Sequence, residues 1–248
     1  MSDVTFNEAM NFTKPDLILV LNVKRFTQRR AFMESQLKKL GLNAEFIFDW
    51  DIEDLNDTIV DQYFTDRSLR QAQQSCALKH VVALQKIADS HCQFALVLED
   101  DAVFADDFLL GLHRAMAQSQ NFPGDKIIYI GSGGNFFTPK SQRKAGQYLY
   151  PGHRGRFADS YLLDSQTARK RLDWIARHKI SLAIDNQFDT MDRLLGIQLL
   201  WLEHPVVEQG SKNGLFQSAV ENDPPPWLKG WLFRWEKLKR KYIYQLWR

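Results

Sequence analysis

Short apolar runs alternate with segments of helical periodicity along the first half of the chain. The apolar runs within 16–22, 44–50, 94–98 and 126–130 predict strands. Between them, apolar positions recur three and four residues apart in 26–42, 68–90 and 106–118, which predicts amphipathic helices. Because strand and helix alternate in this way, we expect an α/β fold with a mostly parallel sheet covered on both faces.

The second half of the chain begins with a loop and then returns to regular elements. Residues 131–147 contain several glycines and polar residues, which predicts a loop. Beyond it we expect a strand at 156–164, a helix at 165–178 capped by Ser165, a helix at 183–196 and a strand at 197–203. The prolines at 224–226 indicate a linker, so we expect one domain over residues 1–223 and a tail over residues 224–248.

The chain is predicted to be cytoplasmic. Its apolar run Leu17–Leu21 is far too short to cross a bilayer, and residues 1–15 lack the regions of a signal peptide. Cys76 and Cys92 have neither metal-ligand nor disulfide spacing, and we interpret them as reduced, buried thiols. No dense set of histidines and cysteines is visible in the sequence, which argues against zinc.

Charge is distributed unevenly between body and tail. The whole chain has a net charge of +2, but residues 224–248 hold seven lysines and arginines against one glutamate. The body is therefore net negative, and we expect no nucleic acid partner. In the tail, Trp227, Trp231 and Trp235 are four residues apart, which predicts a basic, Trp-rich amphipathic helix on the anionic inner leaflet of a membrane. The alternative is a helix that docks on the body through these tryptophans.

Three consecutive carboxylates, Glu99, Asp100 and Asp101, follow the apolar run 94–98. In a parallel sheet, ligands gather at the carboxyl ends of strands, and neighbouring carboxylates suit a hard cation such as Mn²⁺ or Mg²⁺. If the strand continued, its period of two would put Glu99 and Asp101 on one side. The alternative is a solvated turn whose acids cap the following helix.

Several segments together resemble glycosyltransferase family 25, bacterial enzymes of lipopolysaccharide assembly that are related to procollagen galactosyltransferases. The resemblance covers residues 16 to about 218, and its segments are "LVLNVKRFTQRRAFMESQLKKLGL", "SCALKHVVALQKI", "ALVLEDD", "SYLLDSQTARKRL" and "AIDNQF". It implies a GT-A type fold, a nucleotide-sugar donor and inversion at the anomeric carbon. The chain departs from the family pattern at Ser75, where glycine is usual, and at Lys79, where serine is common.

The resemblance and the predicted strand ends together indicate site residues. Glu99 and Asp101 would hold the Mn²⁺ or Mg²⁺ ion, and Asp185 would be the general base that an inverting transfer needs. Asp159 would contact the acceptor. The residues expected to bind the donor are Asn22, Arg25, Arg29, His80, Glu99, Asp100 and Asp101.

Each of these assignments has a structural alternative. The residues after the first strand would otherwise form a solvated helical turn, His80 would belong to the core, and Asp159 to an edge-strand turn. Asp185 would otherwise cap the helix that follows it, with Asp189 and Asp192 as alternative bases.

The function expected from the sequence is metal-dependent transfer of a hexose, galactose from UDP-galactose, to a lipopolysaccharide or lipooligosaccharide. The enzyme would work in the cytoplasm, peripherally on the inner membrane, on a lipid-linked oligosaccharide acceptor. One alternative is a glycosyltransferase-like protein that only binds glycan. Another is a metal-dependent phosphohydrolase or nucleotidyltransferase, although the additional carboxylates of a two-metal site are not apparent in the sequence.

Overall fold

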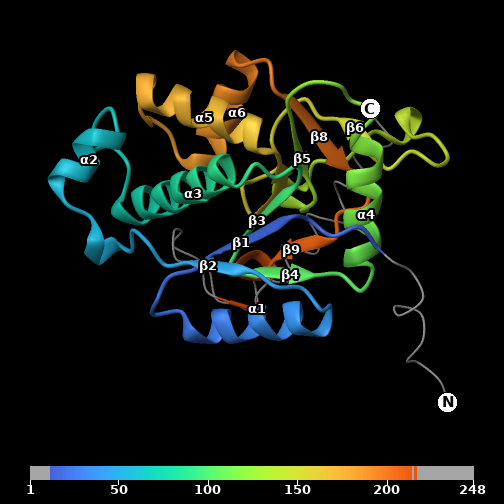
Figure 1. The fold of residues 1–248 in the computed structure, drawn as a ribbon, viewed down its shortest axis with the longest axis horizontal. Coiled ribbons are helices and arrows are strands. Elements are labelled where there is room, and N and C mark those ends of the chain that lie inside the picture. Colours follow the sequence, from blue (N-terminus) through green and yellow to red (C-terminus); the bar gives the residue numbers. More distant parts are fainter. Residues whose placement is uncertain (1–11, 214, 217–248) are drawn as a thin grey trace.

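A seven-stranded sheet forms the centre of the molecule, as the computed structural model shows for the residues it describes, 12–213, 215 and 216 (Figure 1). The strands lie in the order β2-β1-β3-β7-β5-β8-β6. Their bounds are β1 (Leu17–Leu21), β2 (Glu45–Ile47), β3 (Ala95–Glu99), β5 (Lys126–Tyr129), β6 (Leu149–Pro151), β7 (Ser160–Leu163) and β8 (Gln198–Leu202).

The sheet is largely parallel, as the alternating pattern predicted. Among these strands, only β6 and β7 are antiparallel to the strands beside them. A parallel connection requires a crossover, usually through an α-helix. The chain between β5 and β7 contains no α-helix, only β6 and the short 3₁₀ helices η2 (Gly133–Asn135) and η3 (Lys140–Gln142). Consistent with this, β7 pairs antiparallel with both β3 and β5.

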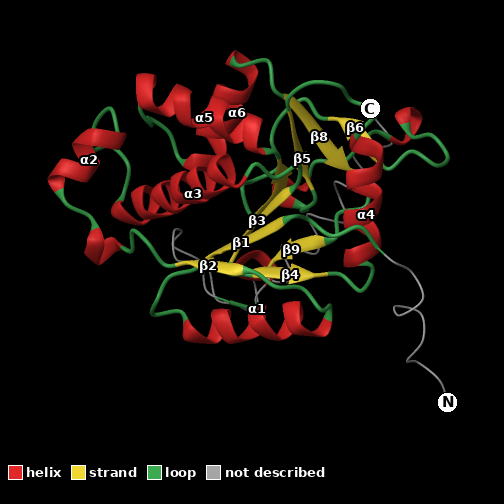
Figure 2. Ribbon diagram, in the orientation of Figure 1, coloured by secondary structure: helices red, strands yellow, loops and turns green. Residues whose placement is uncertain are grey.

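Helices cover both faces of the sheet, which confirms the layered arrangement (Figures 1 and 2). Ile18 and Val20 of β1 pack in a core with residues of α1 (Thr27–Lys39) and α4 (Phe108–Ser119). Leu19 and Leu21 point to the opposite core, which contains residues of α3 (Gln71–Ser90), α5 (Ser165–His178) and α6 (Ile184–Leu194). The period of two along the strand therefore divides the apolar side chains between two helical layers.

Two short elements that the sequence did not predict form a separate two-stranded sheet. In it, β4 (Ala102–Phe104) pairs antiparallel with β9 (Val207–Gln209), and Ala102 lies opposite Gln209. The helix α7 (Gly210–Asn213) follows β9 directly. This pairing brings the end of the described chain beside the acidic residues 99–101. Other elements that the sequence did not predict are β6, the 3₁₀ helices η2, η3 and η1 (Ile52–Asp54), and α2 (Asp57–Tyr63).

Two helix starts differ from the expectations. Asp164, and not Ser165, caps α5, because the Asp164 side chain accepts a hydrogen bond from the Thr167 N–H at 2.7 Å. The alternative that Asp185 is a helix cap is wrong, since α6 begins at Ile184 and Ala183 occupies the N-cap position.

The predicted basic, Trp-rich tail lies outside the described residues, as does the boundary at residue 223. Among the helices that are described, none combines the length and the apolar character needed to cross a membrane.

Candidate active site

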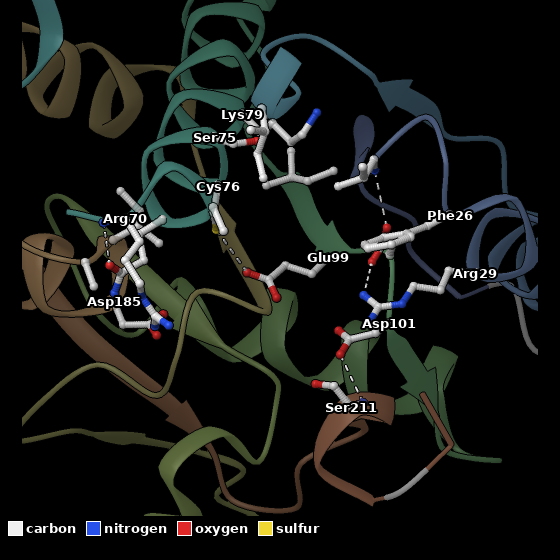
Figure 3. A pocket seen from close by; sticks show the side chains of 18 of the residues that line it. Phe26, Arg29, Arg70, Ser75, Cys76, Lys79, Glu99, Asp101, Asp185 and Ser211 are labelled. Atoms are coloured by element: carbon white, nitrogen blue, oxygen red, sulfur yellow. Dashed lines mark hydrogen bonds and ion pairs between the residues drawn. The ribbon is translucent and has the colours of Figure 1, made fainter. Parts of the chain in front are cut away.

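A pocket of about 370 Å³ lies where the carboxyl ends of β1 and β3 meet the first turns of α3 and α6 (Figure 3). This volume is in the range of small-molecule sites. The predicted site residues that line it are Arg25, Arg29, Glu99, Asp100, Asp101 and Asp185. The other predicted residues, Asn22, His80 and Asp159, are buried and do not line it.

Asp100 is held by the elements that follow β1. Its carboxylate accepts hydrogen bonds from Asn22 Nδ2 at 2.7 Å and from Arg29 Nη1 at 2.8 Å. Burial raises the pKa of Asp100 above its usual value, and the charge of Arg29 opposes that rise. Asn22 is fully buried, so any influence of Asn22 on a ligand passes through Asp100.

Asp101 is held by the β9–α7 corner on the other side. Its Oδ2 accepts a hydrogen bond from the Ser211 N–H at 3.1 Å, and its backbone carbonyl accepts one from the Gly210 N–H at 2.7 Å. Its Oδ1 is buried and has no hydrogen-bond partner among the described residues. A buried carboxylate oxygen without a donor is costly, which makes this atom a candidate ligand for a cation.

Glu99, the last residue of β3, extends toward α3 (Figure 3). Its Oε1 lies 3.8 Å from Cys76 Sγ and 3.7 Å from His80 Nε2. Burial, and then repulsion from Asp101 and Asp100, raises the pKa of Glu99 to about 8. Without a compensating cation, this carboxyl is therefore largely protonated at neutral pH.

The acidic residues do not form a solvated turn. Asp100 and Asp101 are 5% and 3% exposed, and the N-cap of α4 is Asp107. The strand also ends at Glu99, so its period of two does not continue through the turn. The three carboxylates therefore contact different residues: Glu99 lies beside Cys76, Asp100 pairs with Arg29, and Asp101 accepts a hydrogen bond from Ser211.

Asp185 lies in the first turn of α6 and lines the pocket from the side of α3 and α6. Its Oδ1 accepts a hydrogen bond from the Ala158 N–H at 2.6 Å, which fixes the carboxylate against the segment before β7. The alternative bases on the same helix do not line the pocket. Asp192 is fully buried in an ion pair with Arg171, and Asp189 pairs with Arg193.

His80 and Asp159 are both buried next to Glu99, since His80 Nε2 lies 3.7 Å from its carboxylate and the Asp159 carbonyl accepts a hydrogen bond from its N–H. Burial lowers the pKa of His80 to about 3, so its imidazole is neutral. Burial, followed by repulsion from Glu99 and Asp101, raises the pKa of Asp159 well above its usual value. Asp159 is only 1% exposed, so burial and the neighbouring carboxylates both disfavour its charged form.

The two positions that depart from the family pattern hold one wall of the pocket. The Ser75 hydroxyl donates to the Trp50 carbonyl at 2.6 Å, and Lys79 Nζ pairs with Asp51 at 2.7 Å. Lys79 also donates to the Asp49 carbonyl. Both side chains therefore fasten the turn after β2, from which Ile52 and Glu53 reach the pocket.

Cys76 is a pocket residue that the sequence reasoning did not assign to the site. It precedes His80 by four residues on α3, so both lie on one helical face. The spacing of four residues from His80 could have indicated Cys76 from the sequence. The contact between Cys76 and Glu99 could not be predicted, because it depends on how α3 packs over β3.

Comparison with known proteins gives a consistent family. The model of "Glycosyltransferase family 25 (LPS biosynthesis protein)" matches residues 16–188. The "Putative glycosyltransferase R655" of Acanthamoeba polyphaga mimivirus is 35% identical over 120 residues, which cover 46% of this chain and 36% of that protein. The "Probable inactive glycosyltransferase 25 family member 3" of Rattus norvegicus is 28% identical over 129 residues, covering 47% and 22%. The matches thus span about a third of the length of these relatives or less.

Two solved structures show weaker likeness. Mouse xyloside xylosyltransferase 1 in its apo form has a TM-score of 0.40 and 16% identity, with coverage of 73% of this chain and 71% of that chain. A mutant Drosophila β-1,4-galactosyltransferase 7 in complex with manganese, UDP-Gal and xylobiose has a TM-score of 0.43 and 13% identity, with coverage of 84% and 76%. Scores this low define neither fold family nor function, whereas the family model matches well over half of the chain. On that match, this chain belongs to glycosyltransferase family 25.

Proposed function

We propose that this protein is an inverting, metal-dependent glycosyltransferase of GT-A type that transfers galactose from UDP-galactose to a lipopolysaccharide or lipooligosaccharide acceptor. The observation that carries the proposal is one pocket, in a family 25 chain, with the acidic turn on one wall and Asp185 on another. Such an arrangement separates a donor-binding side from a proton-accepting side, as an inverting transfer requires.

Mn²⁺ or Mg²⁺ fits the oxygen atoms that the pocket offers. Glu99 and Asp101 would hold the ion, and the unpartnered Oδ1 of Asp101 supports this choice. When bound, such a cation neutralises charge on the diphosphate leaving group. Arg29 adds a positive charge on the same wall, where its pairing with Asp100 fixes its position.

Asp185 would accept the proton of the acceptor hydroxyl. Its carboxylate is fixed by the Ala158 N–H, so it can take up a proton without reorganisation. Asp159 and His80 do not line the pocket, and we propose that they support Glu99 and the acidic turn from behind.

A screen of nucleotide-sugar donors with purified protein and Mn²⁺ tests the activity, with released nucleoside diphosphate as the readout. Turnover with UDP-galactose is the expected result. The "probable inactive" relative makes binding without turnover the main rival. Donor binding without release of diphosphate, with or without an acceptor, would instead indicate a family member that binds its ligands and does not transfer sugar.

The role of Asp185 is tested by Asp185→Asn, with Asp189→Asn as the matched control on the same helix. A general base contributes roughly 10²- to 10⁴-fold in rate, so Asp185→Asn should lose turnover by that factor and keep its affinity for UDP. Asp189 does not line the pocket, and its variant should remain much more active. A loss of less than about tenfold in Asp185→Asn would place the base elsewhere.

The cation site is tested by Asp101→Asn, with the exposed Asp106→Asn as the control. Calorimetric titration of UDP with and without Mn²⁺ should show that only Asp101→Asn loses the metal-dependent part of the affinity. If the metal dependence is the same in both variants, Asp101 does not bind the ion.

A further inference from the structure

Cys76, His80 and Glu99 form a cluster of three different potential metal ligands at the back of the pocket. One ligand atom from each residue, the Sγ, a ring nitrogen and a carboxylate oxygen, lies within 4.8 Å of the other two. Glu99 Oε1 is 3.8 Å from Cys76 Sγ and 3.7 Å from His80 Nε2. Figure 3 shows Cys76 and Glu99 pointing toward each other from α3 and β3.

The imidazole of His80 provides a second, independent observation. His80 is fully buried, and its Nε2 has no hydrogen-bond partner among the described residues. Its Nδ1 lies 3.0 Å from the Tyr161 hydroxyl, which can accept the Nδ1 proton. In that tautomer, the lone pair of Nε2 faces Glu99, and Tyr161 fixes the ring as an outer partner of a metal-bound histidine does.

The spacing of these atoms is close to that of a zinc site. Zinc–ligand bonds of about 2.0–2.3 Å in a tetrahedron place neighbouring ligand atoms about 3.5 Å apart. The cluster needs only small side-chain movements to reach that arrangement. Cys76 and Glu99 also line the pocket, so a fourth position on the ion would be open to water.

We propose that, against the expectation from the sequence, Cys76, His80 and Glu99 bind Zn²⁺, at a site that shares Glu99 with the Mn²⁺ or Mg²⁺ site of Glu99 and Asp101. Thiolate and imidazole ligands favour zinc, whereas the all-oxygen set favours the hard cations. When Zn²⁺ binds, Cys76 Sγ, His80 Nε2 and a Glu99 carboxylate oxygen replace water molecules on the ion, and the protons of the thiol and of the Glu99 carboxyl pass to the buffer.

Both sites use Glu99, so they compete for it. One part of this inference rests on the proposed function: Zn²⁺ inhibits sugar transfer, because it holds Glu99 beside α3 and away from the Mn²⁺ or Mg²⁺ ion. The binding of Zn²⁺ itself does not depend on any catalytic activity.

Cobalt substitution in the full chain tests the site, because Co²⁺ bound to thiolate has a charge-transfer absorption that carboxylate ligands lack. The chain has two cysteines, and Cys92 is the matched control, since it lies outside the cluster. Wild type and Cys92→Ser should show the thiolate band and lose it when Zn²⁺ is added, whereas Cys76→Ser should show no band. In calorimetry, Cys76→Ser should bind Zn²⁺ at least about tenfold more weakly.

Absence of the band in wild type, or a band that depends on Cys92, overturns the proposal. A transfer assay, in which each variant is compared with its own zinc-free rate, then tests inhibition separately. Zinc binding at Cys76 without inhibition refutes the competition for Glu99 and leaves the site intact. If no donor is turned over but the cobalt band is present, the proposed function fails and the zinc site stands.

Discussion

At the scale of single residues, the support of the pocket depends on charged groups that are completely buried. Arg171 of α5 donates two hydrogen bonds to Asp192 of α6, at 2.9 and 2.6 Å, and neither side chain is exposed. The guanidinium also lies 3.9 Å from the ring centroid of Phe188. The helix that carries Asp185 is therefore attached to α5 by a desolvated ion pair.

Asp192→Asn should lower the free energy of unfolding by about 3–5 kcal/mol, because it leaves the charge of Arg171 buried without a counter-charge. Glu34→Gln is the control, since it removes an exposed ion pair with Arg30 and should cost at most about 1 kcal/mol. Urea unfolding of both variants measures the difference. Similar losses in the two variants would contradict the importance of the buried pair.

The histidine at position 80 should make stability depend on pH. Burial lowers its pKa from 6.5 to about 3, so between these values the unfolded chain binds a proton that the folded chain does not. The stability contributed by neutral His80 is therefore lost as the pH falls below 6.5, by about 1.4 kcal/mol per pH unit. In metal-free protein, the stability difference between wild type and His80→Gln should shift against wild type as the pH falls. A constant difference in urea unfolding between about pH 7.5 and pH 4.5 would contradict this.

At the scale of elements, long apolar segments were predictable and short pairings were not. The run 94–98 identified β3 and placed Glu99–Asp101 at its carboxyl end, and the spacing in 68–90 identified α3. The strands β4 and β9 have only three residues each, too few to show a period, and their pairing joins distant parts of the chain. The sequence therefore predicted Asp101 as a site residue, but it did not predict the contact with the β9–α7 corner that holds Asp101.

Gly111 shows how closely α4 packs on the connection between β8 and β9. A Cβ at this position would lie 2.4 Å from Val206 Cγ1. Gly111→Ala should therefore destabilise the protein by about 1–3 kcal/mol, although alanine is the better helix former. The double variant Gly111→Ala with Val206→Ala should recover part of that loss, because it removes the atoms that clash. Thermal or urea unfolding measures both, and strictly additive losses would contradict the packing explanation.

At the scale of the whole molecule, the proposed acceptor is bound to lipid, whereas the described helices offer no membrane span. The sequence of residues 224–248, with its tryptophans and excess of basic residues, remains our proposed means of attachment to an anionic surface. In the alternative, the tail docks on the net negative body through its tryptophans, and its deletion should then make the protein insoluble.

Deletion of Pro226 to Arg248 should abolish sedimentation with anionic vesicles and weaken transfer to a lipid-linked acceptor. Transfer to a soluble oligosaccharide should continue. Replacing Lys239, Arg240 and Lys241 with glutamine is a milder variant, which should lose about 3 kcal/mol of vesicle binding at about 1 kcal/mol per charge. Neutral vesicles are the control. Undiminished sedimentation of the deletion variant, or its insolubility, would refute attachment through the tail.

The contact between Asp101 and Ser211 joins residues 110 positions apart. At a synthesis rate of about 5–20 residues per second, a ribosome needs roughly 5–20 s after making the acidic turn to make the segment that holds it. The family match ends at residue 188, before β8 and β9 have been made. A nascent chain stopped there lacks the strand between β5 and β6, and it lacks the Gly210 and Ser211 N–H groups that hold Asp101. We therefore expect that a nascent chain cannot bind substrate until the ribosome has synthesised the residues of α7.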